Sequence, residues 1–130
     1  MANWSKIRRA ARDFERYAES LPCPQCGKLE VKACPNRSIG HIDAVCFHCG
    51  AGISVKNERK RLNNTYRTKP TSAPAYFSAL KLWGENKLFA LVGNVKGHKF
   101  YTYQGHTHKL TTAARNHNTP RVMLKLSEVS

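Results

Sequence analysis

The chain has 130 residues, with 22 lysines and arginines against 8 acids, so its formal net charge is +14 at pH 7. That length allows one ordinary domain or two small modules. The charge favours a polyanionic partner, most often nucleic acid, although it also suits solubility or attraction to another acidic surface. No apolar run is long enough to span a bilayer, and residues 1–20 lack the apolar core of a signal peptide. We therefore expect a cytoplasmic protein, or one in another reducing intracellular compartment, that is not secreted and has no membrane or small-molecule partner.

Residues 1–20 are predicted to form an N-terminal amphipathic helix. Apolar residues spaced three and four apart form one stripe of Trp4, Ile7, Ala11, Phe14, Ala18 and Leu21. We expect this stripe to pack on the rest of the protein or in a partner's groove. The opposite face carries Lys6, Arg9, Asp13 and Arg16, and its flanks carry Arg8, Arg12, Glu15 and Glu19. Such a face is either an ordinary solvated helix surface or a phosphate-binding surface.

Two C-x2-C pairs dominate residues 21–56. Nineteen residues separate Cys23 and Cys26 from Cys46 and Cys49. This spacing predicts a single structural Zn²⁺ site, because two short loops each deliver two sulfurs to one tetrahedral ion and leave no position for an activated water. The glycine after each second cysteine fits a sharp turn at the metal. The alternatives are two disulfides, unlinked buried thiols or a redox C-x2-C pair.

Short β-like runs surround these cysteines. Leu29, Val31 and Ala33 alternate with polar residues, and further runs occur at Ile42–Val45 and Ile53–Val55, which predicts a three-stranded zinc ribbon. Cys34 is an unmatched fifth cysteine, which we expect to be a free thiol rather than a ligand. His41 and His48 are assigned no metal role, because two intact cysteine pairs already supply four ligands.

The second cysteine pair carries a resemblance to a known family. Cys46-Phe47-His48-Cys49-Gly50-Ala51-Gly52 resembles the second knuckle of primase-type zinc-binding domains. More loosely, residues 21–56 are similar to the zinc ribbons of transcription factors, topoisomerases and ribosomal proteins. In those families the ribbon usually contacts nucleic acid or docks on a larger nucleic-acid machine. Because nothing after residue 56 resembles a primase catalytic domain, the resemblance implies zinc ligation by the four cysteines and not polymerase activity.

Residues 57–72 are predicted to be a basic linker. From Lys56 to Ser72, six cations meet the single acid Glu58, and no apolar periodicity marks a core. The segment either lies along a phosphate backbone or is a solvated connector. The candidate phosphate contacts in it are Arg59, Lys60, Arg61, Arg67 and Lys69.

Residues 73–130 are predicted to be a small, antiparallel, β-rich C-terminal module. Tyr76, Phe77, Leu80 and Trp83 suit one side of a short helix that ends before Gly84, although Lys81-Leu82-Trp83 could equally begin a strand. The strand candidates are Leu88–Val92, Phe100–Tyr103, Leu110–Thr112 and Val122–Leu126, and Thr111–Arg115 could instead include a helical turn. The predicted fold class is therefore α+β: an N-terminal amphipathic helix, a four-cysteine zinc ribbon and this module.

Two side-chain patterns in the C-terminal module suggest further sites. Tyr101 and Tyr103 share one strand face near Lys99 and Lys109, which suits stacking on single-stranded nucleic acid but equally suits core or cross-strand pairs. A second metal site or a nuclease could use His106, His108 and His117. No carboxylate lies between Glu85 and Glu128, so a hydrolytic metal site would lack nearby acidic ligands.

Three hypotheses for function remain. The first is a non-enzymatic nucleic-acid-binding zinc-ribbon protein that acts in transcription, replication or a related process. The second is a small basic protein that docks on a larger nucleic-acid enzyme or defence complex and modulates or inhibits it. The third is a histidine-dependent nuclease, for which the sequence offers the least support.

Overall fold

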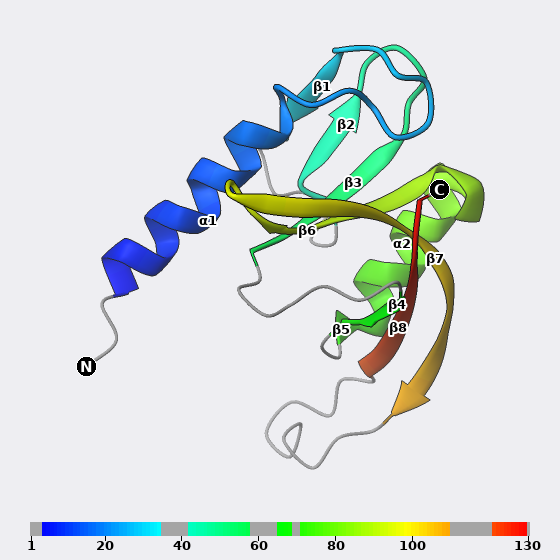
Figure 1. The fold of residues 1–130 in the computed structure, drawn as a ribbon. Coiled ribbons are helices and arrows are strands. Elements are labelled where there is room, and N and C mark those ends of the chain that lie inside the picture. The colour runs from blue at the N-terminus through cyan, green and yellow to red at the C-terminus, as the bar shows by residue number, and fades with distance from the viewer. Residues whose placement is uncertain (1–3, 35–41, 58–64, 69–70, 110–120, 130) are drawn as a thin grey trace.

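The computed structural model describes residues 4–34, 42–57, 65–68, 71–109 and 121–129 (Figure 1). Its helices are α1 (Trp4–Ala18), α2 (Ala73–Trp83) and the short 3-10 helix η1 (Glu85–Lys87). Its strands are β1 (Val31–Ala33), β2 (Ala44–Cys46), β3 (Gly52–Asn57), β4 (Thr65–Arg67), β5 (Thr71–Ser72), β6 (Leu88–Asn94), β7 (Gly97–Lys109) and β8 (Arg121–Glu128). This is a small α+β protein with an N-terminal helix and C-terminal strands, as predicted. Within these ranges, no helix combines the length and apolar character needed to cross a bilayer.

All the described strands belong to one sheet. Its order is β1-β2-β3-β6-β7-β8-β4, and β5 also pairs with β8. The ribbon strands β1, β2 and β3 are antiparallel, and so are β6, β7 and β8. β3 and β6 run parallel, from Gly52 opposite Leu88 to Asn57 opposite Gly93. Strands β1, β2 and β3 and the C-terminal strands therefore share a continuous hydrogen-bonded sheet.

The segment predicted to be a basic linker contributes to this sheet. β4 and β5 both lie within residues 57–72 and both pair with β8. Tyr66 packs against the core and Thr68 is buried, so the described part of the segment is not a solvated connector. The sequence hides these strands because they are two and three residues long and show no apolar alternation. The predicted strand Leu110–Thr112 and the alternative turn Thr111–Arg115 lie outside the described residues.

The two helices pack on opposite faces of the sheet, and β6 shows why. Leu88, Ala90 and Val92 point into a core formed with α2, whereas Phe89 and Leu91 point into a core formed with α1. Side chains that alternate along a strand reach both faces, so a strand covered on both faces is apolar throughout. α2 contributes Tyr76 and Ala79 to the first core, and α1 contributes Phe14 and Ala18 to the second.

α1 is anchored through its C-terminal half. Phe14 and Ala18, from the predicted apolar stripe, are buried, and Ala11 and Leu21 are partly buried. Beyond the helix, Glu19 Oε2 accepts a hydrogen bond from the Ala33 backbone N–H at 2.6 Å, which ties the end of α1 to β1. Figure 1 shows the N-terminal turns of α1 extending away from the sheet.

Candidate metal centre

Four cysteine sulfurs converge where the two knuckle loops meet. All four sulfurs lie within 4.8 Å of one another, with Cys23 Sγ 3.5 Å from Cys49 Sγ and Cys26 Sγ 3.6 Å from Cys46 Sγ. A tetrahedral ion with metal–sulfur bonds of about 2.3 Å needs sulfurs about 3.8 Å apart. A disulfide would need about 2 Å, and all five cysteines are free. The predicted ligands are therefore assembled and could hold one metal ion.

Two matching turns bring the sulfurs together. The Gly27 N–H donates to the Cys23 carbonyl at 2.9 Å, and the Gly50 N–H donates to the Cys46 carbonyl at 2.8 Å. Gly27 has φ 76° and Gly50 has φ 83°, a region that side chains with a β-carbon disfavour. Both knuckles therefore use glycine to turn the chain back beside the sulfurs, as the sequence pattern predicts.

Burial and backbone amides act in opposite directions on the pKa values of these thiols, and burial prevails at Cys23 and Cys49. Burial raises the pKa of Cys23 to about 12, although the amides of Cys26 and Gln25 act against it. At Cys46, burial also raises the pKa, but the amides of Cys49 and His48 and the neighbouring sulfurs outweigh it and lower the pKa to about 7. Thiolates are the form that binds metal. Amides directed at the sulfurs therefore fit a site made for a cation with thiolate ligands.

The centre is part of the core rather than an appendage. Cys23 and Cys46 are buried in the core that contains Phe14 and Ala18 of α1. Cys26 and Cys49 are partly exposed. Lys87, at the end of η1, donates from Nζ to the Cys49 carbonyl at 3.2 Å and so places a cation at the second knuckle. Sequence reasoning missed this lysine, because it lies 38 residues from Cys49 and belongs to no motif.

Cys34 stands apart from the four clustered cysteines. It packs against the α2-side core, and its N–H donates to the Asp43 carbonyl at 2.8 Å. Burial, together with the charge of Asp43, raises the pKa of its thiol. This position agrees with the prediction of a free thiol. His48 is exposed beside the second knuckle, and His41 lies outside the described residues.

Most of the predicted phosphate contacts are not located by the structure. Arg59, Lys60, Arg61 and Lys69 lie outside the described residues. Arg67 is in β4, where it pairs with Lys125 of β8, and Lys109 is the last residue of β7, where it pairs with Arg121. Their part in nucleic-acid binding stays a prediction.

The predicted stacking platform needs a correction. Tyr101 is 0% exposed and Tyr103 is 5% exposed, and both rings belong to the α2-side core. Burial also raises the pKa of Tyr103, which is hydrogen-bonded to Ser54. These rings cannot receive a base, so they are the core residues that the alternative interpretation describes. Lys99, which was expected to act with them, forms an ion pair with Glu128 at 3.3 Å.

The histidines of the C-terminal half do not form a second cluster among the described residues. His106 lies between aromatic rings, 5.1 Å from both Tyr76 and Phe77 between ring centroids. His108 is in β7 opposite Val122, and His117 falls outside the described ranges. Within those ranges, the four cysteines are the only group of three or more side chains placed to share a metal ion.

Comparison with known proteins adds no relative. No protein-family model matches the chain, and a search of curated proteins also finds no match. The likeness of residues 46–52 to primase-type knuckles therefore stays a prediction, and function is argued from the site itself.

Proposed function

We propose that this is a non-enzymatic nucleic-acid-binding protein whose shape depends on one structural Zn²⁺ held by Cys23, Cys26, Cys46 and Cys49. The observation that carries the proposal is the convergence of four sulfurs within 4.8 Å of one another in a strongly cationic chain. Four thiolates in a tetrahedral arrangement select zinc or iron, and zinc is the usual ion of closed structural sites. When bound, it would cross-link the two knuckles and so hold β1, β2 and α1 in place.

The disposition of acidic groups supports a polyanionic partner. Three acids serve internal contacts: Glu19 accepts from the Ala33 N–H, Asp43 accepts from the Val55 N–H, and Glu128 pairs with Lys99. Few acids then remain to offset the 22 lysines and arginines of the chain. Zinc bound by four thiolates would lower the formal charge only to about +12. A surface of this sign attracts nucleic acid and supports a transcription, replication or related role.

The experiment compares zinc-loaded and zinc-free protein for binding to labelled DNA and RNA over a series of salt concentrations. Zinc loading lowers the positive charge, so charge alone predicts that the zinc-free form binds at least as tightly. If zinc gives the chain its binding shape, the loaded form should bind more tightly, with an affinity that falls steeply with salt. Absence of binding in both forms would refute the nucleic-acid function. Equal binding would refute the role of zinc in it.

A second candidate function, docking on a larger nucleic-acid enzyme or defence complex, is favoured by two exposed apolar side chains. Phe47 is 73% exposed and Leu29 is 65% exposed, both in the zinc module. Their loops are adjacent, because the Phe47 N–H donates to the carbonyl of Glu30 at 2.9 Å. Exposed apolar residues that gather at one place are typical of protein-binding surfaces.

This candidate is tested by purification after nuclease treatment. A docking function predicts a partner that is retained by the wild type and lost with Leu29→Ala and Phe47→Ala. Leu82→Ala is the matched control, because Leu82 is also 65% exposed but lies on α2. Loss of the partner from all three variants, or from none, would argue against docking through the zinc module.

A further inference from the structure

We infer that the arginine face of α1, formed by Arg8, Arg9, Arg12 and Arg16 with Ser5, binds the phosphate backbone of double-stranded DNA, an inference that rests on the proposed function. All five residues are exposed, and with Asp13 they line a shallow groove of about 580 Å³. At about 100° per residue, the arginines and Ser5 fall within one sector of about 100°. Phe14, the buried anchor of the helix, points in the opposite direction.

An ordinary solvated helix face does not explain this arrangement. Solvated faces usually alternate acids and bases, so that residues four apart attract one another. Asp13 follows Arg9 at that spacing and Glu15 lies three residues after Arg12, but Arg8, Arg12 and Arg16 form a row of like charges, which destabilises a helix. None of the four guanidinium groups has an ion pair or hydrogen bond to another residue in the described ranges. Glu19, which shares this side of the chain, is held by the Ala33 N–H instead.

The helix dipole makes the pattern still less favourable for the isolated protein. Acidic side chains stabilise the first turn of a helix and basic side chains stabilise the last. Arg16 lies in the last turn, where its charge is favourable, but the first turn of α1 has no acid, and Arg8 and Arg9 follow it directly. A bound polyanion would offset both the row of like charges and the adverse dipole. The arginine face is therefore better suited to binding an anion than to stabilising the helix.

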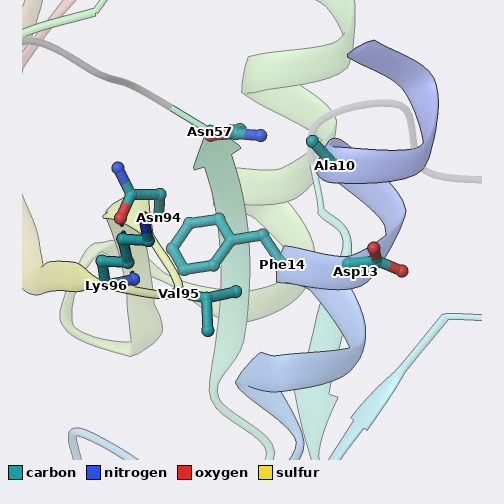
Figure 2. A pocket seen from close by; sticks show the side chains of 7 residues that line it. All are labelled: Ala10, Asp13, Phe14, Asn57, Asn94, Val95 and Lys96. Carbon is teal, nitrogen blue, oxygen red and sulfur yellow. Dashed lines mark hydrogen bonds between the residues drawn. The ribbon is translucent and has the colours of Figure 1, made fainter. Parts of the chain in front are cut away.

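The position of α1 leaves this face accessible. Figure 2 shows Phe14 reaching from α1 toward Val95, while the side chain of Asp13 points away from that contact. A hollow of about 520 Å³ lies beside them, lined by Ala10, Asp13, Phe14, Asn57, Asn94, Val95 and Lys96. The described side chains therefore hold the helix from its middle to its C-terminal end. The N-terminal turns project past the sheet (Figure 1).

These dimensions favour duplex DNA over other nucleic acids. An α-helix is about 10–12 Å across and fits the major groove of B-form DNA, which is about 12 Å wide. The major groove of duplex RNA is too narrow for a helix. Single strands are usually held by exposed aromatic rings, but Tyr101 and Tyr103 are buried. The exposed rings of Phe47 and Phe77 lie on the second knuckle and on α2, and neither ring lines the groove of the arginine face.

The test measures the affinity of zinc-loaded protein for a DNA duplex of about 20 base pairs, or two helical turns, as salt is varied. Each phosphate contact contributes about 0.9 to the slope of log affinity against log salt. The triple variant Arg8→Gln, Arg12→Gln, Arg16→Gln should lower that slope by about 2.7 and weaken binding at least about tenfold. The same three positions changed to lysine should keep most of the slope. The triple variant Lys28→Gln, Lys32→Gln, Lys81→Gln removes the same charge from exposed positions elsewhere and is the control.

The outcomes separate this inference from the proposed function. If the wild type binds no nucleic acid, the proposed function fails. If the wild type binds but the triple arginine-to-glutamine variant keeps its slope, the inference fails and the proposed function stands. The same conclusion follows if the triple lysine-to-glutamine control loses as much slope as that variant. Tighter binding to single-stranded DNA or to duplex RNA would also overturn it. If the triple arginine-to-glutamine variant does not fold, NMR of the wild type tests the inference instead. The guanidinium resonances of the three arginines must then shift when the duplex binds, and unchanged resonances would overturn the inference.

Discussion

Gly52 lies directly against the indole ring of Trp83: a β-carbon at Gly52 would come within 3.1 Å of the ring atoms. Gly52 begins β3 just after the second knuckle, and Trp83 ends α2. The last glycine of the Cys-Gly-Ala-Gly run thus serves a contact between the second cysteine loop and α2. Through this contact the ribbon and the C-terminal half share one core.

Gly52→Ala should therefore destabilise the protein. The added methyl would displace the indole, and overpacking of this kind destabilises a protein by about 1–2 kcal/mol after the lower entropy of the unfolded alanine chain is considered. Urea unfolding of zinc-loaded protein measures the change. Gly97→Ala is the matched control, because a β-carbon there meets no heavy atom within 4 Å. Equal stability of the two variants would contradict the packing described here.

Glu19→Ala should loosen α1 from the sheet. It removes the acceptor of the 2.6 Å hydrogen bond from the Ala33 N–H, and such a bond to a charged group contributes about 1–2 kcal/mol when part-buried. Glu19→Gln keeps an oxygen acceptor and should lose less. Glu30→Ala, at an exposed position just before β1, should change stability by less than about 0.5 kcal/mol. Hydrogen exchange of the Ala33 amide reports the effect directly, and unchanged protection in Glu19→Ala would rule out the contact.

Lys87→Gln should speed the loss of zinc to a chelator. The ammonium group lies 3.2 Å from the Cys49 carbonyl, and it would offset part of the negative charge of a zinc ion held by four thiolates. Exposed charge contacts are weak, so the expected effect is only about twofold to fivefold. Lys81→Gln, on the exposed side of α2, should leave the rate unchanged. If zinc is lost from Lys87→Gln and from Lys81→Gln at the same rate, Lys87 does not stabilise the bound ion.

Local patterns in the sequence predicted α1, most of the strands and the cluster of four cysteines, and they suited a helix at α2 with a strand at its end as the alternative. The stripe that includes Phe14 and Ala18 locates α1, and apolar runs locate β6, β7 and β8. The four cysteines are predictable because metal ligation requires a fixed spacing within each knuckle. The turns that this spacing requires also predicted the role of Gly27 and Gly50.

Contacts between distant segments were not predictable in this way. The parallel pairing of β3 with β6 and the contact of Lys87 with Cys49 depend on how the chain returns to the sheet after α2. The burial of Tyr101 and Tyr103 also depends on tertiary packing, because aromatic residues that alternate on a strand suit a core as well as a binding surface. Sequence alone left those alternatives open.

The most direct test is native mass spectrometry of the wild type, Cys46→Ser and Cys34→Ser. The four-sulfur centre predicts one zinc ion per chain in the wild type and in Cys34→Ser, and in the zinc-bound wild type Cys34 should be the only thiol that reacts with an alkylating reagent. Cys46→Ser should lose the ion and the order of the ribbon. Metal-free wild type with five reactive thiols, or zinc lost from Cys34→Ser but retained by Cys46→Ser, would contradict the proposed centre.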